Sequence, residues 1–225
     1  MELRSIDVYE PAAISTIAAR SGFPLAYDPT IKRLLDVLLA GIGLVLSLPI
    51  WLAVAIAIKL DSSGPVFFVQ ERVGMHGRRF PFLKFRSMYA DAEHRLQDLL
   101  PANEASGPVF KIRKDPRITR VGRFIRKTSI DELPQLINIL RGEMSLVGPR
   151  PALVREAESY RPSDRDRLLV KPGLTCLWQV RGRADVDFET WMEYDREYVQ
   201  RRSLLLDAEI LLRTVVVVLT CRGAY

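Results

Sequence analysis

Histidine and cysteine are scarce in this chain. Among its 225 residues there are two histidines, His76 and His94, and two cysteines, Cys176 and Cys221. So few histidines argue against a histidine-based zinc site and against a serine–histidine hydrolase. The two cysteines lack a metal-ligand spacing and supply no disulfide framework. Free thiols facing the cytoplasm are the simpler interpretation.

Negative charge is also in the minority. Lysine and arginine number 33 against 27 acidic residues, which leaves a net charge of +6. This excess favours an anionic partner, either nucleic acid, an anionic membrane surface or a phosphorylated substrate. Nucleic acid is the weakest of the three because no recognised binding signature accompanies the charge. Hydrophobic residues make up 48% of the chain, enough to build a buried core.

A long uncharged run is present near the N-terminus. The segment "VLLAGIGLVLSLPIWLAVAIAI", Val37 to Ile58, has 22 residues without a charge, more than the roughly 18 that indicate a membrane helix. Pro49 near its middle cannot donate to the carbonyl of Val45, so we expect a kink there. Ser47 is placed to hydrogen-bond backbone freed near the kink.

The charges around this run favour a helix that enters and leaves the membrane on one side. Basic residues prefer the cytoplasmic face, and they flank both ends: Lys32 and Arg33 before the run, and Lys59, Arg72, Arg78, Arg79 and Lys84 after it. The arm from Val37 to Leu48 would be about 18 Å long, too short to cross a core of roughly 30 Å. One tilted span and a buried hairpin in a soluble domain stay open as alternatives.

The remaining pattern predicts an α+β fold that is mostly helical. Gly64 to Met88 reads as a small β-hairpin because Gly74 and Gly77 divide its β-branched and aromatic runs. Helices are expected at residues 91–100, 133–140, 152–160, 188–203 and 204–220, the last on the core or in the membrane interface, with a loop and a short extended piece at 171–183. We expect a variable lead-in at 1–30, a re-entrant membrane helix at 31–60 and a catalytic domain at 61–225.

Two adjacent acidic residues, Asp131 and Glu132, lie in the most basic part of the chain. Local structure explains part of this, because Ser129-x-x-Glu132 fits a capping box at a helix start. Pro134 complicates that reading, since at the fifth helical position it would leave the carbonyl of Ile130 unpaired. Capping explains neither Asp131 nor the basic surroundings.

A chemical role accounts for both carboxylates. Arg126, Lys127 and Arg150 would lower the pKa of a nearby carboxylate and could bind phosphoryl oxygens. An ionised aspartate beside such arginines can attack phosphorus and form an acyl-phosphate. Mg²⁺ suits one or two carboxylates together with phosphate oxygens, and it would reduce their mutual repulsion.

The segment "DPRITRVGRFIRKTSIDELPQLINILRGEMSLVGPRP" closely resembles the bacterial sugar transferases, small monotopic polyprenyl-phosphate phosphoglycosyl transferases that begin exopolysaccharide and O-antigen assembly. The resemblance runs from about Lys32 to Tyr225 and includes "KRLLD", "GPVFFVQERVG", "KFRSM" and "KPGLTCLWQVRGR". Motifs of this length in this order are highly specific.

The resemblance implies a reaction and a set of roles. A sugar 1-phosphate would pass from a UDP-sugar to undecaprenyl phosphate with release of UMP, on the cytoplasmic face of the bacterial inner membrane. Asp131 matches the covalent nucleophile and the Mg²⁺ site, and Glu132 matches the acid that assists it. Arginines around the phosphate match Arg126 and Arg150, and further positions in family motifs near the site are Lys84, Gln179, Arg183 and Asp195. Membrane lipids and downstream glycosyltransferases are the implied partners, with no nucleic acid.

Two positions depart from the family pattern. Leu48 stands between Ser47 and Pro49, where the family often has serine directly before the proline, and Cys176 stands where glycine is common. The expected form is the minimal catalytic one, without the extra spans of larger members. A non-catalytic membrane scaffold is the competing class, and the intact Asp131, Glu132, Arg126 and Arg150 argue against it.

Overall fold

The computed structural model describes residues 28–182 and 186–220. Helices are α2 (Pro29–Asp61), α3 (Leu96–Leu99), α4 (Arg120–Lys127), α5 (Gln135–Arg141), α6 (Val154–Glu158), α7 (Leu177–Arg181), α8 (Phe188–Arg201) and α9 (Leu204–Leu219), with 3₁₀ turns η1 (Met75–Gly77), η2 (Leu100–Ala102), η3 (Ile130–Glu132) and η4 (Pro162–Leu169). Strands are β1 (Phe67–Val73), β2 (Arg79–Phe85), β3 (Ser145–Val147), β4 (Ala152–Leu153) and β5 (Gly173–Thr175). The prediction of a mostly helical α+β fold is confirmed.

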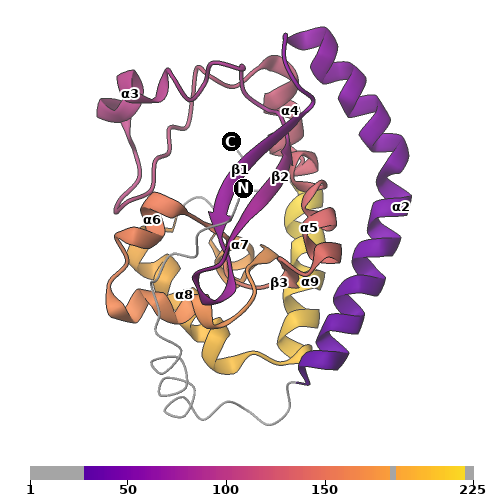
Figure 1. The fold of residues 1–225 in the computed structure, drawn as a ribbon, viewed down its shortest axis with the longest axis vertical. Coiled ribbons are helices and arrows are strands. Elements are labelled where there is room, and N and C mark those ends of the chain that lie inside the picture. Colours follow the sequence, from indigo (N-terminus) through magenta and orange to yellow (C-terminus); the bar gives the residue numbers. More distant parts are fainter. Residues whose placement is uncertain (1–27, 183–185, 221–225) are drawn as a thin grey trace.

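Helix α2 is a single bowed helix along one side of the molecule (Figure 1). The Asp28 carboxylate caps its first turn by accepting from the N–H groups of Thr30 and Ile31. Helical backbone continues through Pro49, so the kink expected there does not divide α2 into two helices. Proline removes one backbone hydrogen bond from the helix. The helix can bend at that point while its other backbone hydrogen bonds remain.

The side chains around Pro49 form a short hydrogen-bonded chain. Ser47 Oγ donates to the carbonyl of Leu44 over 3.0 Å and accepts from Nε1 of Trp51 over 3.1 Å. The predicted contact of Ser47 with backbone near the bend is therefore present. It is made to the carbonyl of Leu44 rather than to the carbonyl of Val45, which proline leaves without its usual donor.

One side of α2 packs against the rest of the molecule along the whole length of the helix. Its buried residues run from the first turn to the last: Lys32, Asp36, Ala40, Ser47, Val54 and Ile58. The opposite side exposes large apolar side chains, among them Leu34, Leu46 and Leu60. By length and composition, α2 is the one helix in the described residues that could cross a membrane. Its exposed apolar side is consistent with membrane association.

The predicted hairpin is confirmed as two antiparallel strands, β1 and β2, paired from Phe67↔Phe85 to Val73↔Arg79. The turn between them contains His76 in the left-handed region, with φ 58°. Strand β4 extends the sheet through Arg72↔Leu153 and Val73↔Ala152, so the strand order is β2-β1-β4.

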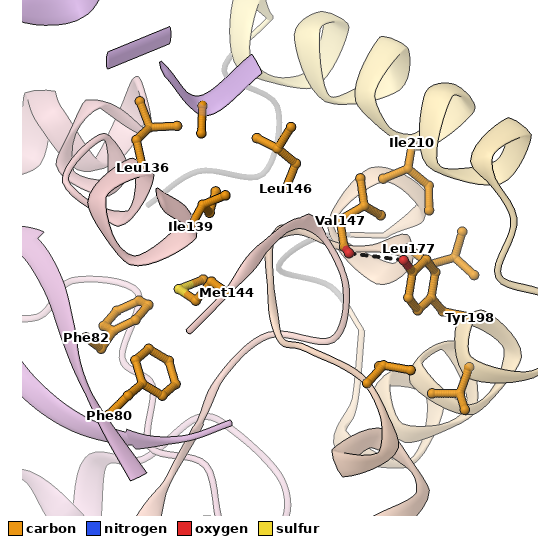
Figure 2. Close-up of a cluster of buried hydrophobic side chains, with 13 residues drawn as sticks. Phe80, Phe82, Leu136, Ile139, Met144, Leu146, Val147, Leu177, Tyr198 and Ile210 are labelled. Atoms are coloured by element: carbon orange, nitrogen blue, oxygen red, sulfur yellow. Dashed lines mark hydrogen bonds between the residues drawn. The ribbon is translucent and has the colours of Figure 1, made fainter. Parts of the chain in front are cut away.

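The main hydrophobic core lies between this sheet, α5 and the C-terminal helices (Figure 2). Phe80 and Phe82 come from β2, and Leu136 and Ile139 come from α5. Figure 2 shows Leu177, Tyr198 and Ile210 closing the other side of the cluster, with the Tyr198 hydroxyl donating to the carbonyl of Val147.

A small parallel sheet of β3 and β5 crosses this core and leads into the segment Pro149–Pro151. Two glycines let the backbones meet there. A Cβ on Gly148 would lie 2.3 Å from the carbonyl oxygen of Lys171, and one on Gly173 would lie 2.1 Å from the nitrogen of Gly148. Because a side chain at either position would collide with backbone, glycine is required at this approach.

Two predicted elements differ in extent. The helix expected at 91–100 contains only the short α3 followed by η2, and none of the α3 residues is buried. Short helices without tertiary packing are marginal, so the local pattern overstated its length. The loop expected at 171–183 holds helix α7, which burial of Leu177 against the core stabilises.

Candidate active site

The adjacent carboxylates lie on a 3₁₀ turn between two helices. Asp131 and Glu132 belong to η3, which joins α4 to α5. Ser129, before the turn, has left-handed backbone with φ 58° and makes no capping hydrogen bond through its side chain. The predicted capping box is therefore wrong. Pro134 prevents the regular α-helical start that a box requires, and α5 begins only at Gln135.

A lysine from the hairpin stands between the two carboxylates. Lys84 Nζ donates to Oε1 of Glu132 over 2.9 Å and lies 3.6 Å from Oδ2 of Asp131. Nη1 of Arg150 donates to the same Oε1 over 3.1 Å. The side chains of Asp131, Glu132 and Lys84 are between 8% and 16% exposed. The cluster is mostly withdrawn from water, but each of these three side chains keeps some exposed surface.

The two carboxylates have opposite pKa shifts. Burial raises the pKa of Asp131 and the neighbouring charge of Glu132 adds to this, although Lys84 opposes it. Burial would also raise the pKa of Glu132, but Lys84 and Arg150 outweigh it and lower that pKa to about 2. The predicted effect of the basic surroundings is therefore present at Glu132, whereas at Asp131 burial dominates. Glu132 stays ionised while Asp131 holds a proton more readily.

Both predicted phosphate arginines are near the pair. Arg150 contacts Glu132 directly, and the charges of Arg126 and Arg150 both lower the pKa of Asp131. Arg126 lies in the last turn of α4, which also carries an outer basic face of Arg120, Arg123 and Lys127 around Phe124. The structure thus gathers Lys84, Arg126 and Arg150 around the acidic pair.

Two other predicted site residues, Gln179 and Asp195, contact partners outside the acidic pair. Gln179, in α7, accepts a hydrogen bond from Sγ of the buried Cys176 over 3.0 Å. Asp195 is 1% exposed and forms an ion pair with Arg167, whereas the acidic pair contacts Lys84 and Arg150. Arg183 lies outside the described residues.

Asn138 is a residue of the site that sequence reasoning missed. It is fully buried in α5, and its amide binds the outer edge of β2. Oδ1 accepts from the N–H of Leu83 over 3.1 Å, and Nδ2 donates to the carbonyl of Pro81 over 2.7 Å. Asn138 therefore sets the position of β2, and with it Lys84, relative to the turn that precedes α5. A lone polar residue in the apolar run "LINIL" was the available signal.

The donor atoms fit a magnesium ion that shares its coordination with a substrate. In residues 28–182 and 186–220 there is no group of three or more histidine, cysteine or acidic side chains that could hold a metal. The carboxylates of Asp131 and Glu132 are hard oxygen donors. One or two such groups are what Mg²⁺ uses when phosphate oxygens and water complete its shell.

Comparisons with a family model and with known proteins agree on one family. The family model described as "Bacterial sugar transferase" matches residues 27–221. The exopolysaccharide production protein ExoY of Sinorhizobium fredii is 42% identical over 86% of this chain and 88% of its own length.

Two larger relatives match over the same region. Galactosyl transferase CpsE of Streptococcus agalactiae is 48% identical over 86% of this chain, and the undecaprenyl-phosphate galactose phosphotransferase of Salmonella typhimurium is 44% identical over 87%. The matched part covers 43% and 42% of their own lengths, so the chain spans less than half of each.

Proposed function

The chain belongs to the bacterial sugar transferase family, and on that premise we propose that it transfers a sugar 1-phosphate from a UDP-sugar to undecaprenyl phosphate with release of UMP. This would be the first membrane step of exopolysaccharide or O-antigen synthesis. The names of its relatives support the acceptor, since one is an undecaprenyl-phosphate galactose phosphotransferase and another an undecaprenyl-phosphate glucose phosphotransferase.

The observation that carries the proposal is a buried aspartate beside an ionised glutamate, within reach of one lysine and two arginines. In the proposed first step a carboxylate oxygen of Asp131 attacks the β-phosphorus of the UDP-sugar. The bond from that phosphorus to the bridging oxygen breaks, and UMP leaves. The product is a phosphosugar bound to Asp131 as an acyl-phosphate.

In the second step an oxygen of undecaprenyl phosphate attacks the same phosphorus. The acyl-phosphate bond breaks, and the Asp131 carboxylate is restored. Lys84, Arg126 and Arg150 would stabilise the charge on the phosphoryl oxygens in both steps. Glu132 remains ionised and holds Lys84 and Arg150 in position through its Oε1.

Magnesium fits this scheme as a cofactor. Asp131, with Glu132 beside it, would hold the ion from the protein side. A bound Mg²⁺ would reduce the repulsion between the carboxylates and the diphosphate of the donor. It would also offset the effect of burial on Asp131, which otherwise favours the protonated and non-nucleophilic form.

The contacts of α2 support a monotopic placement on the cytoplasmic face. Its first turn is bound to the domain through Lys32 and Asp207, at 2.9 Å. Its last residue, Asp61, accepts from the N–H of Val121 over 3.0 Å. A helix whose two ends are held by one polar domain is better suited to enter and leave on one side than to cross.

The test is UMP release by purified protein in detergent, with Mg²⁺ and a panel of UDP-sugars, in the presence and in the absence of undecaprenyl phosphate. We expect release with at least one sugar. Asp131→Asn should lower the rate by about a thousandfold or more, in the range for loss of a nucleophile. Asp98→Asn, an exposed change on α3, is the matched control and should leave the rate unchanged.

Three results would contradict the proposal. Equal UMP release by Asp131→Asn would remove Asp131 as the nucleophile. Release that requires bound undecaprenyl phosphate would exclude the two-step order. No release by folded protein with any donor would favour the scaffold class instead.

A further inference from the structure

The segment Pro149–Pro151 carries Arg150 and is held through its carbonyl groups. Pro149 and Pro151 have no N–H, so this segment has few donors of its own. Each of its three carbonyls accepts a hydrogen bond from a different element. Gly173 N–H donates to Pro149 over 2.9 Å, Arg167 Nη2 to Arg150 over 2.6 Å, and Arg72 Nη1 to Pro151 over 3.0 Å.

Arg167 differs from a surface arginine in its burial. Its side chain is 2% exposed, and its Nη2 lies 2.9 Å from Oδ2 of Asp195, which is 1% exposed. Its Nη1 donates to the hydroxyl of Tyr160, and the guanidinium lies 5.4 Å from the Tyr160 ring centre and 5.3 Å from that of Trp191. The guanidinium is therefore fixed from several directions at once.

A buried ion pair is by itself weak evidence of stability, because desolvation of both charges offsets their attraction. The Arg167–Asp195 pair also has a third partner, because Arg167 donates to the carbonyl of Arg150. Stability alone does not explain this contact. Lysine could replace the charge of Arg167. It could not reproduce the planar guanidinium, which donates to Tyr160 and to the carbonyl of Arg150 while it stays at ion-pair distance from Asp195.

We propose that Arg167, held in place by Asp195, is a positioning residue that directs the side chain of Arg150 towards Glu132 and the phosphoryl site. Asp195 then acts on Arg150 only through Arg167, and it does not itself touch the substrate. This inference rests on the proposed function for the role of Arg150, but the orientation that it assigns to Arg150 can be tested without turnover.

The experiment compares wild type with Arg167→Lys, alone and combined with Arg150→Ala. Arg161→Lys is the matched control, because Arg161 also pairs with carboxylates but is half exposed. Thermal melting establishes that each variant is folded. Two quantities are then measured. The first is the rate of UMP release at saturating donor. The second is the rate at which phenylglyoxal modifies Arg150 in the absence of substrate, as detected by peptide mass spectrometry.

We expect Arg167→Lys to lower kcat by about ten- to a hundredfold, the size expected when a catalytic group is displaced by about 1 Å. In the Arg150→Ala background the same change should cost less than about twofold, because no side chain is left to direct. Arg150 should react severalfold faster with phenylglyoxal in Arg167→Lys, because the hydrogen bond from Arg150 to Glu132 is weakened. Arg161→Lys should change neither quantity.

Unchanged modification of Arg150 in folded Arg167→Lys would overturn the inference, whatever the rates. An equal loss of kcat in both Arg150 backgrounds would also overturn it, because that is the result of a purely structural role. If Arg167→Lys does not fold, Asp195→Asn replaces it, with a smaller change in the same direction expected. If wild type releases no UMP, the proposed function fails and the modification rate alone decides this inference.

Discussion

Two residues that are adjacent in the chain have different chemical environments in the fold. Glu132 is held by Lys84 and Arg150 through one oxygen, and its pKa falls to about 2. Asp131 is more deeply buried and lies farther from Lys84, at 3.6 Å against 2.9 Å for Glu132, and burial raises its pKa. Environments that separate the pKa values of two carboxylates are the usual basis for giving them different roles.

The first prediction concerns the pH dependence of stability at Glu132. Its folded-state pKa of about 2 lies below the ordinary value of 4.5. The ionised group therefore contributes stability that is fully present above pH 4.5 and is lost as the pH falls towards 2. This shift corresponds to about 3 kcal/mol. We expect the stability difference between wild type and Glu132→Gln to fall by about half from pH 7 to pH 3.

The measurement is denaturant unfolding in detergent with EDTA and no substrate, so that no metal contributes. Glu158→Gln, at an exposed position on α6, is the control and should show no such trend. A difference between wild type and Glu132→Gln that is the same at every pH would show that Lys84 and Arg150 do not lower this pKa.

At the scale of elements, the first turn of α2 is part of the domain. Lys32 Nζ lies 2.8 Å from Oδ1 of Asp36 and 2.9 Å from Oδ2 of Asp207. Arg33 donates to the carbonyls of Ile139 and Leu140 at the end of α5. The two cations that the charge pattern assigned to membrane orientation therefore also bind the helix to α5 and α9.

The second prediction follows from this binding. Lys32→Met leaves Asp36 and Asp207 buried without their cation, and loss of one partner of a buried pair costs about 3–5 kcal/mol. We expect the melting temperature in detergent to fall by roughly 10 °C. Lys59→Met removes a lysine at the other end of α2, where the side chain is exposed and donates to Gly64, and should have a much smaller effect. Equal losses from the two changes would contradict the assignment.

At the scale of the whole molecule, the rest of the described chain contacts α2 along its full length. Contacts run from Lys32 at one end to Asp61 at the other, while the outer side of the helix remains apolar. The acidic pair lies on η3, between the two helices α4 and α5, and both of these helices contact α2. This arrangement would let a soluble nucleotide sugar and a lipid-bound phosphate meet at one surface.

The third prediction tests this topology with two cysteines. Asp28→Cys and Ser63→Cys place thiols at the two ends of α2, in a protein whose Cys176 and Cys221 are replaced by alanine. We expect a membrane-impermeant maleimide to label both positions only from the cytoplasmic side, in inverted vesicles. Glu158→Cys in the exposed part of the domain is the positive control. Labelling of the two positions from opposite sides would establish a simple span.

Local sequence patterns were sufficient for several features of the fold. The uncharged run predicted α2 because apolar length is a local property, and the glycines at the tip of the hairpin predicted β1 and β2. Helices α8 and α9 were predicted close to their observed bounds. The pattern overstated α3 and missed α7, because packing against distant residues decides whether such short helices form.

The sequence by itself determined which groups are available: an adjacent acid pair, the arginine between two prolines and an apolar helix with basic flanks. Only the tertiary structure decided how these groups act. It brought Lys84 from β2 to the acid pair through the amide of Asn138, and it placed Asp195 behind Arg167. It also gave Asp131 and Glu132 opposite pKa shifts. The physical reason is that burial and charge–charge distance depend on neighbours distant in sequence, which no local pattern specifies.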